Sequence, residues 1–401
     1  MFYPEYIDPK KLINNDDLLL LFKLVEKNGG SLRFVGGAVR DALVGISRTD
    51  VDLVTDMSPS EFSDMCDDEG LRCIPIGIQF FTLGVMIHNS FFKVTCLSVD
   101  EDSTQDEWKK DAAKRDLTIN AVYADDKGNV FDYYNGIQDL EKGVIKFIGK
   151  PAASIDFDCI RVMRFFRFCA MFGKKIDKKS LKCCIEKKDL LQKVSLEKIK
   201  DELFKIIMAP YAIRALELLF NHGILDFLIA PPKDYNKIEK YIEKESILNL
   251  DHNVIVRIFL LFEPTLRRAE RLSSIFRLNK EQKEHLLTLC QMQSHCKEFK
   301  NSASINKLIY KYGKIICKEM FIFQHLDDVD STELSQILNT VDSINLPKFP
   351  LTGKDLLLIG ADKKFIGLYL DVLKKEWIES DCSLTKNNLL DKYEKIFKYS
   401  V

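Results

Sequence analysis

The feature that most constrains the fold is a change in the spacing of apolar residues near residue 150. Before it, the runs IPIGIQFFTLGVMIH and SFFKVTCLSV are rich in β-branched and aromatic residues, as strands usually are. After it, DCIRVMRFFRFCAMFG and AIRALELLFNHGIL carry apolar residues at helical intervals. We therefore expect an α+β fold, with a mixed sheet over residues 31–130 and an almost wholly helical remainder.

Shorter signals divide the chain further. The run NNDDLLLLFKLVEKNGG predicts a leading helix within residues 1–30 that ends at a glycine pair. Two prolines and a glycine in LPKFPLTG, residues 346–353, predict a break that introduces a final helical unit. A chain of 401 residues with 46% hydrophobic residues can bury a sizeable core, so two to four structural units are expected.

Composition limits the cellular setting and the partners. No charged segment followed by an apolar run opens the chain, and no apolar run is long enough to cross a bilayer. The eleven cysteines are scattered, with no evident disulfide framework and no C-x-x-C pair, which favours reduced thiols. Together these features predict a cytoplasmic protein without membrane contact. Because the formal net charge is −1, a nucleic-acid partner would need local basic surfaces. One candidate is residues 174–205, with 11 lysines and 6 acidic residues, although a solvated helix face explains such a run equally well.

The segment FVGGAVRD, which begins at residue 34, predicts a strand, a glycine turn and a helix. Gly36 and Gly37 lack Cβ atoms, so their backbone N–H groups can approach phosphate oxygens closely. Arg40 falls on the first turn of the expected helix, where its guanidinium could bind phosphate bidentately. A glycine pair alone is more often a simple turn.

Asp50 and Asp52 form the sharpest chemical signal in the sequence. They stand two residues apart in a strand-like run, so both side chains point to one face. Two neighbouring carboxylates repel each other unless a cation joins them. Their oxygens suit Mg²⁺, and two such ions can act on both sides of a phosphoryl displacement. The alternative for a lone D-x-D is a polar strand edge.

These motifs, together with KRDLTINAVY at 114–123 and DCIRVMRFFRF at 158–168, resemble the class II tRNA nucleotidyltransferase and bacterial poly(A) polymerase family. The resemblance runs along most of the chain. It implies a DNA polymerase β-like nucleotidyltransferase head over residues 1–150 and a helical neck with a base-selecting helix over 151–230. It implies a helical body and tail that bind RNA over 231–401.

By this resemblance, the segment KRDLTINAVY binds the sugar and phosphates of the incoming nucleotide. Arg115 would contact the triphosphate, and Asp116 and Asn120 would position the ribose. Their chemistry agrees, since a cation suits phosphate and oxygen acceptors suit a 2′-hydroxyl. A helix N-terminus capped by Asp116 or Thr118 is also compatible with this segment.

By the same resemblance, the segment DCIRVMRFFRF selects the base with protein side chains. Asp158 and Arg161 are three residues apart, which in a helix places them together on one face. A carboxylate beside a guanidinium can mimic the edge of a base, and in the family such a pair selects CTP and then ATP. Arg164 and Arg167 would lie near phosphate or RNA. The alternative is a surface salt bridge worth about 0.2–0.5 kcal/mol.

Several positions differ from what is frequent in the family, among them Phe157 and Lys93. Phe157 stands where many members carry the glutamate that helps to hold the base-selecting residues. Lys93 replaces an acid close to the expected metal site. A cation there could weaken Mg²⁺ binding or partly replace the ion.

The sequence thus predicts an enzyme that adds CCA, from CTP and ATP, to tRNA 3′ ends and releases pyrophosphate. Two Mg²⁺ ions would serve as cofactors, and the acceptor arm and elbow of tRNA would be the partner surfaces. A poly(A) polymerase, or an enzyme that adds only C or only A, shares the same motifs. A non-catalytic RNA-binding paralogue is the alternative of another class. The sequence carries no signal for the oligomeric state.

Overall fold

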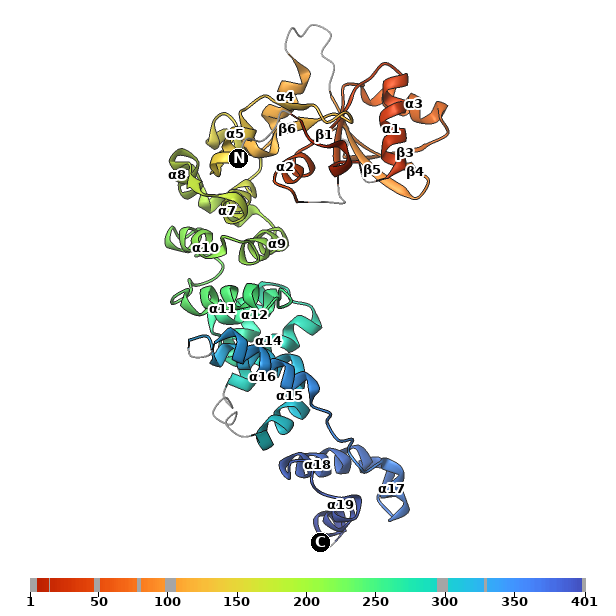
Figure 1. The fold of residues 1–401 in the computed structure, drawn as a ribbon, viewed down its shortest axis with the longest axis vertical. Helices are drawn as coiled ribbons and strands as arrows, with labels where there is room; N and C mark the ends of the chain where they lie inside the picture. Colours follow the sequence, from red (N-terminus) through yellow and green to blue (C-terminus); the bar gives the residue numbers. More distant parts are fainter. Residues whose placement is uncertain are drawn as a thin grey trace. The chain divides into compact units, whose positions relative to one another are not determined.

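The computed structural model describes residues 6–13, 15–46, 51–77, 81–97, 106–293, 302–327 and 330–398. The chain divides into two compact units, Met1–Ala230 and Pro231–Val401 (Figure 1). The first unit contains the sheet and the helices that follow it, and the second consists of helices. The finer division of the first unit near residue 150 stays a prediction.

A seven-stranded sheet forms the centre of the first unit, in the order β3-β4-β5-β2-β1-β6-β7. The strands are β1 Leu32–Val35, β2 Asp52–Thr55, β3 Arg72–Gly77, β4 Thr82–Ile87, β5 Ser90–Cys96, β6 Val122–Ala124 and β7 Val130–Asp132. Strands β2 and β5 are parallel, whereas the other neighbouring pairs are antiparallel. The predicted mixed sheet is therefore confirmed, and it extends as far as Asp132.

One row of residues runs across five strands of this sheet. Ile74 pairs with Gly84, Gly84 with Lys93, Lys93 with Asp52, and Asp52 with Val35. Residues opposite each other on neighbouring strands project to the same face. This row therefore places Asp52 and Lys93 side by side.

Two helices cover one face of the sheet at β1, β3 and β4. Helices α1 Asp16–Lys27 and α3 Pro59–Asp68 contact each other, and both contact strands (Figure 1). Helix α1 buries Leu18, Leu21, Phe22 and Val25, the spacing of an apolar stripe, and Asn15 accepts a hydrogen bond from the N–H of Leu18 (2.8 Å) as its cap. The leading helix is thus shorter than residues 1–30.

The opposite face is covered over only part of its area. Helix α4 Glu107–Lys114 contributes Trp108 and Ala112 to a core that includes Val54 and Tyr123. Strand β5 lies partly outside this core, because Phe91 and Lys93 are exposed on the same face. Part of this face is therefore open to solvent.

The remainder of the first unit is mainly helical. Its helices are α2 Gly37–Leu43, α5 Gly136–Lys142, α6 Pro151–Phe157, α7 Arg161–Phe172, α8 Lys178–Glu186, α9 Leu196–Ile207 and α10 Ala212–Asn221, with 3₁₀ turns η1 Pro9–Lys11, η3 Thr118–Asn120 and η4 Lys188–Lys193. Helix α7 packs against α9 and α10. The helical prediction after residue 150 holds except for β9 Lys175–Ile176, which pairs with β8 Val144–Ile145.

The second unit is built from helices in the residues that the structure describes. They are α11 Asn236–Ile247, α12 Val254–Phe262, α13 Leu266–Ile275, α14 Lys280–Gln293, α15 Ser302–Gln324, α16 Ser331–Ser343, α17 Gly353–Leu358, α18 Ile366–Glu379 and α19 Lys386–Tyr393, with η6 Lys363–Phe365 and the π-helical turn η7 Glu394–Lys398. The gap between α16 and α17 confirms the break predicted from LPKFPLTG. None of the helices described here is both long and apolar enough to span a bilayer.

Trp377 anchors the last helical group, and its removal tests that core. The side chain is 1% exposed and meets the rings of Tyr310 and Phe349 edge-on at 5.1 and 5.4 Å. We expect Trp377→Ala to lower the free energy of unfolding by about 3–5 kcal/mol, because the cavity adds to the lost burial. Urea denaturation followed by circular dichroism measures this. Leu358→Ala is the control, because Leu358 is 85% exposed. Equal effects of the two changes would contradict the assignment.

Candidate functional site

The glycine turn begins at the end of β1. Gly36 has φ 69° and ψ −123°, a combination that residues with a Cβ avoid. Its N–H donates to the carbonyl of Val122 (3.3 Å), and α2 begins at Gly37. The strand, turn and helix predicted from the sequence are therefore confirmed.

Asp52 opens β2 beside this turn. Its register partner on β1 is Val35, the residue before Gly36, and its partner on β5 is Lys93. Asp52 and Lys93 are both exposed. Asp50, the predicted second carboxylate, lies outside the described residues.

The donor chemistry at this position fits a hard divalent cation only in part. The exposed carboxylate of Asp52 is a suitable oxygen ligand, whereas the ammonium of Lys93 cannot ligate a cation. Among the described residues, no group of three or more His, Cys, Asp or Glu side chains is arranged to hold a metal. A metal site here would therefore need further oxygen ligands beside Asp52.

Arg115 reaches the glycine turn from the end of α4. Its Nη1 lies 3.7 Å from the point where a Cβ at position 36 would stand. Its Nη2 donates to Asp111 Oδ2 (2.9 Å), and its Nε donates to the hydroxyl of Tyr123 (3.1 Å). Burial opposes the charge, but Asp111 and Tyr123 outweigh it and keep the pKa of Arg115 above its ordinary value. The guanidinium is thus a fixed cation beside the turn.

Asp111 and Tyr123 are functional candidates that the sequence analysis missed. The Tyr123 hydroxyl donates to Asp111 Oδ2 (2.6 Å), so the two side chains and Arg115 form a closed triangle. Burial is the main reason why the pKa of Tyr123 is raised. The spacing of four residues between Asp111 and Arg115 on a helix would have indicated their contact. Tyr123 shows no such signal, because its partners come from another element.

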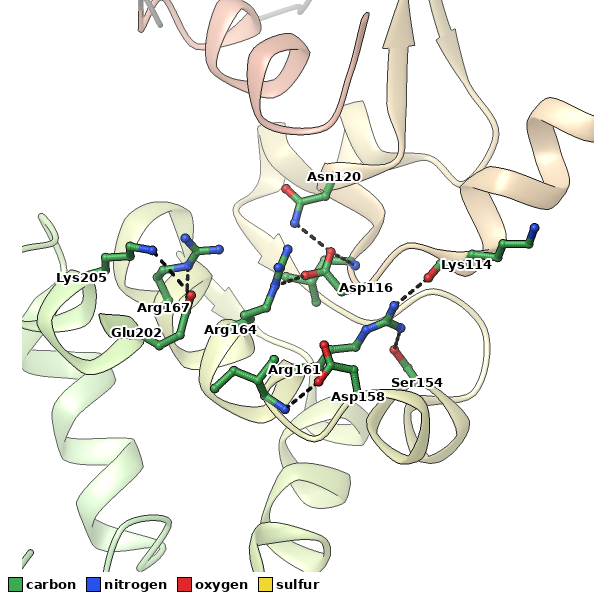
Figure 2. A network of polar contacts seen from close by, with 12 residues as sticks. Lys114, Asp116, Asn120, Ser154, Asp158, Arg161, Arg164, Arg167, Glu202 and Lys205 are labelled. Atoms are coloured by element: carbon green, nitrogen blue, oxygen red, sulfur yellow. Dashed lines mark hydrogen bonds and ion pairs between the residues drawn. The ribbon is translucent and has the colours of Figure 1, made fainter. Parts of the chain in front are cut away.

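Asp116 is the centre of a buried polar network (Figure 2). Its Oδ2 accepts from Arg164 Nε (2.6 Å), and its Oδ1 accepts from Asn120 Nδ2 (2.9 Å) and from the N–H of Leu117 (2.8 Å). Burial by itself would raise the pKa of Asp116, but the charge of Arg164 and these hydrogen bonds lower it below the ordinary value. The structure thus brings three predicted site residues together.

Arg40 lies in the interior, against α7. It is 3% exposed, donates through Nε to Asp41 Oδ1 (2.8 Å), and donates through Nη1 to Asn120 Oδ1. Its guanidinium lies over the rings of Phe168 and Phe172 at 4.8 and 5.0 Å. In this structure Arg40 orients Asn120 and joins α2 to α7.

The prediction that Asp158 and Arg161 share one face of a helix is wrong. Helix α6 ends at Phe157, Asp158 is extended (φ −149°, ψ 108°), and α7 begins only at Arg161. The Asp158 carbonyl accepts from the N–H of Arg161 (3.1 Å), and its Oδ1 accepts from the N–H of Ile160 (3.3 Å). Asp side chains favour such local bonds to the backbone over helix interiors, which explains the break.

Arg161 is nevertheless held close to the sheet domain (Figure 2). Its Nη1 donates to Ser154 Oγ and its Nη2 to the carbonyl of Lys114, both at 2.7 Å. The guanidinium also lies 5.1 Å from the ring centre of Phe157, which is 65% exposed. Burial lowers the pKa of Arg161, although Asp116 and Asp158 oppose this. Phe157 therefore contacts Arg161 through its ring, whereas a glutamate at this position would do so through its charge.

Arg167 is turned toward α9. Its Nε lies 2.9 Å from Glu202 Oε2, and Lys205 lies 3.8 Å from the other oxygen of the same carboxylate (Figure 2). In this structure Arg167 therefore links α7 to α9. Lys182, like several lysines of the basic stretch, also pairs with an acid, so the local positive field of that stretch is weaker than the lysine count suggests.

The Asp116 carboxylate predicts a dependence of stability on pH. The pKa of Asp116 is lower in the folded state than in the unfolded state. Its contribution to folding stability is therefore complete above the unfolded-state pKa of about 3.9, and it is lost as the pH falls through the folded-state pKa. We expect Asp116→Asn to be less stable than the native protein at pH 7, by roughly 1–3 kcal/mol. The difference should shrink below about pH 4. Denaturant titrations at several pH values measure this, and a difference that grows on acidification would contradict it.

Comparison with known proteins places these features in a family. Residues 32–146 match the family described as "Poly A polymerase head domain". Residues 173–233 match the family described as "Probable RNA and SrmB- binding site of polymerase A". The first range contains the glycine turn, Asp52, Arg115 and Asp116.

Two similar curated proteins span different shares of the chain. The mouse protein named CCA tRNA nucleotidyltransferase 1, mitochondrial, is 27% identical over 95% of this chain and 90% of its own length. The CCA-adding enzyme of Streptococcus gordonii is 30% identical over 57% of this chain and 59% of its own length.

Solved structures show the same fold. The CCA-adding enzyme of Bacillus stearothermophilus, in complex with CTP, aligns with a TM-score of 0.74 and 19% identity over 97% of this chain and 99% of that one. The Thermotoga maritima CCA-adding enzyme, complexed with tRNA, aligns with a TM-score of 0.66 and 18% identity over 97% of each chain. The chain thus carries a match to the poly(A) polymerase head domain over residues 32–146, is similar in sequence to CCA-adding proteins along almost its whole length, and shares their fold.

Proposed function

We propose that this protein is a template-independent RNA nucleotidyltransferase that adds CCA, from CTP and ATP, to tRNA 3′ ends and releases pyrophosphate. The observation that carries the proposal is the register of β1 and β2, which puts the Asp52 carboxylate next to the Gly36 turn. Arg115 faces the same turn. A triphosphate in the turn would thus have its reacting phosphorus beside a carboxylate. The names of similar proteins support this chemistry.

Members of this family generally use a divalent metal, and we propose Mg²⁺, with two ions held by Asp50 and Asp52. Bound there, the metal would supply activation of the RNA 3′-hydroxyl and charge neutralisation at the leaving pyrophosphate. Asp52 would orient its carboxylate toward the reacting phosphorus. The N–H groups of Gly36 and Gly37 would donate to phosphate oxygens.

The cation beside the turn would neutralise the triphosphate. Arg115 is already fixed by Asp111 and Tyr123, so binding the triphosphate would cost little side-chain entropy. Asn120 and Asp116 would contact the ribose. Arg40 and Arg164 would position those two residues, because Arg40 donates to Asn120 and Arg164 donates to Asp116.

Selection of the base would fall to Asp158 and Arg161. They remain neighbours although they do not share a helix, because the N–H of Arg161 donates to the Asp158 carbonyl. Their carboxylate and guanidinium offer an acceptor and donors to a base edge. Phe157 would keep Arg161 in place through its ring. Arg164 and Arg167, on the same helix as Arg161, would lie near phosphate or RNA.

The helical remainder would bind the tRNA. We propose a head over residues 1–150, a neck over 151–230, and a body and tail over 231–401 that contact the acceptor arm and the elbow. Recognition by shape suits duplex RNA, whose deep groove hides the base edges. A cytoplasmic location is our proposal, although mitochondrial proteins are among the relatives.

One observation favours an alternative of another class. Lys93 pairs in register with Asp52, and a cation beside the metal ligand weakens metal binding. A non-catalytic RNA-binding paralogue would retain the fold and lose the metal. Poly(A) addition, or addition of only C or only A, remains the alternative within the same chemistry.

An incorporation assay separates these functions. The protein is incubated with Mg²⁺, labelled CTP or ATP, and tRNA lacking one, two or three terminal residues. We expect ordered addition of C, C and A, and expect Asp52→Ala to abolish it without loss of fold, because it removes the metal ligand. Long A tails would instead assign a poly(A) polymerase. RNA binding without incorporation would assign the paralogue, and incorporation by Asp52→Ala would refute the site.

Tyr123→Phe tests the positioning of Arg115. The change removes the hydroxyl that bonds both Arg115 and Asp111, so the guanidinium gains freedom that triphosphate binding must then restrict. We expect the KM for CTP and ATP to rise several-fold, with kcat changed less. Tyr133→Phe is the matched control, because its hydroxyl accepts from Arg33 (3.0 Å) outside the triangle. Equal KM values in the two variants would contradict this role.

A further inference from the structure

Large apolar side chains are exposed on the open part of the sheet, next to Asp52. Ile74, Ile76, Met86 and Phe91 are 41%, 45%, 38% and 45% exposed. Ile74 pairs with Gly84, which pairs with Lys93, and Met86 pairs with Phe91. Ile74, Met86 and Phe91 therefore share the face of Asp52, and the end of Ile76 lies with the Phe91 ring above Gly84 on that face. Helices α1 and α3 cover the opposite face. We call Ile76, Met86 and Phe91 the apolar platform.

Phe91 lies low across the neighbouring strand. Atoms at the far edge of its ring stand 2.6 and 2.8 Å from the point where a Cβ at position 84 would be, and the end of Ile76 stands 2.7 Å from it. Gly84 therefore leaves the space that the ring occupies. An aromatic ring that rests on a glycine and stays partly exposed presents apolar surface to a ligand.

The platform adjoins cations and the proposed reaction centre. Lys93 stands between Phe91 and Asp52 in the sheet, and Arg72 pairs with Met86 at the outer strand. Strand spacing and rise place the Cα of Phe91 about 8 Å from that of Asp52. This distance corresponds to about two stacked nucleotides at about 3.4 Å each.

The two sides of β2 differ in the way that an in-line displacement requires. The Gly36 turn and Arg115 lie on the side of β1, and the platform lies on the side of β5. The attacking and leaving oxygens of a phosphoryl transfer are roughly in line, on opposite sides of the phosphorus. A triphosphate on the β1 side leaves the β5 side for the RNA hydroxyl.

We propose that the apolar platform binds the single-stranded 3′ end of the RNA substrate, with the terminal or penultimate base stacked on Phe91 and a neighbouring phosphate paired with Lys93. Exposed aromatic rings interleaved with cations are the surface that single-stranded nucleic acid recognises through stacking and charge. This inference rests on the proposed function, since it takes Asp52 as the reaction centre. It also gives Lys93 a role as a contact for RNA.

A base-stacking probe tests the platform independently of chemistry. The full chain is mixed, without Mg²⁺ or nucleotide, with tRNA transcripts lacking CCA that carry 2-aminopurine at the terminal or the penultimate position. Stacking on Phe91 should quench the fluorescence of one of them. We expect Phe91→Ala to remove this quenching and Phe91→Trp to retain it. Phe227→Ala, at a side chain that is 40% exposed elsewhere in the same unit, is the control and should leave it unchanged.

Steady-state kinetics provide a second test of the platform. Phe91→Ala should raise the KM for the tRNA at least about fivefold, with the KM for CTP unchanged. Gly84→Ala should act in the same direction, because the new Cβ displaces the ring without altering it. Absence of quenching with the native protein, or native quenching in Phe91→Ala, would overturn the platform. Quenching by a native protein that incorporates nothing would support the platform and reject the proposed function.

Discussion

The position of β2 between its two neighbours is the constraint on which the other features depend. Asp52 faces Val35 on β1 and Lys93 on β5, so it lies between the glycine turn and the open part of the sheet. A slip of one residue would turn its carboxylate to the face that α1 and α3 bury. Val54 and Leu53 prevent such a slip, because each is buried on its own face of the sheet. The burial of Leu53 and Val54 on opposite faces of β2 thus places the reactive group.

Buried polar contacts then join the sheet to the helices. Arg164 of α7 binds Asp116, Asn120 bridges Asp116 and Arg40, and Arg40 packs against the rings of α7. The Asp116 carboxylate and the guanidinium groups of Arg40 and Arg164 each have a polar partner, so their burial is compensated. Removal of one partner would leave the other charge buried without compensation, which destabilises the fold. The site therefore depends on α7, which follows the sheet in sequence.

Much of this fold could be predicted from the sequence. The β-rich runs before residue 130 and the helical spacing after residue 150 each follow from local periodicity, and the structure confirms both. The glycine turn was equally predictable, since only Gly36 suits its backbone conformation. Short strands such as β9 carry too few residues for a periodic signal.

The contacts of the site residues were harder to predict. Asp158 and Arg161 are three residues apart, as neighbours on one helix face would be. Asp158 nevertheless bonds to the nearby backbone, so α6 ends before it and α7 begins only at Arg161. Tyr123 had no local signal, because its contact with Asp111 depends on how α4 packs on β6. The open face around Phe91 could not be recognised either, since exposure depends on which helices cover the sheet. Such features arise from tertiary packing.

The most direct test of the central claim is a crystal structure of the full chain with Mn²⁺, a non-hydrolysable CTP analogue and tRNA lacking CCA. The account predicts anomalous density at the Asp52 carboxylate, with the triphosphate against the Gly36 turn and Arg115. Density for the ion and phosphates at any other place would contradict it.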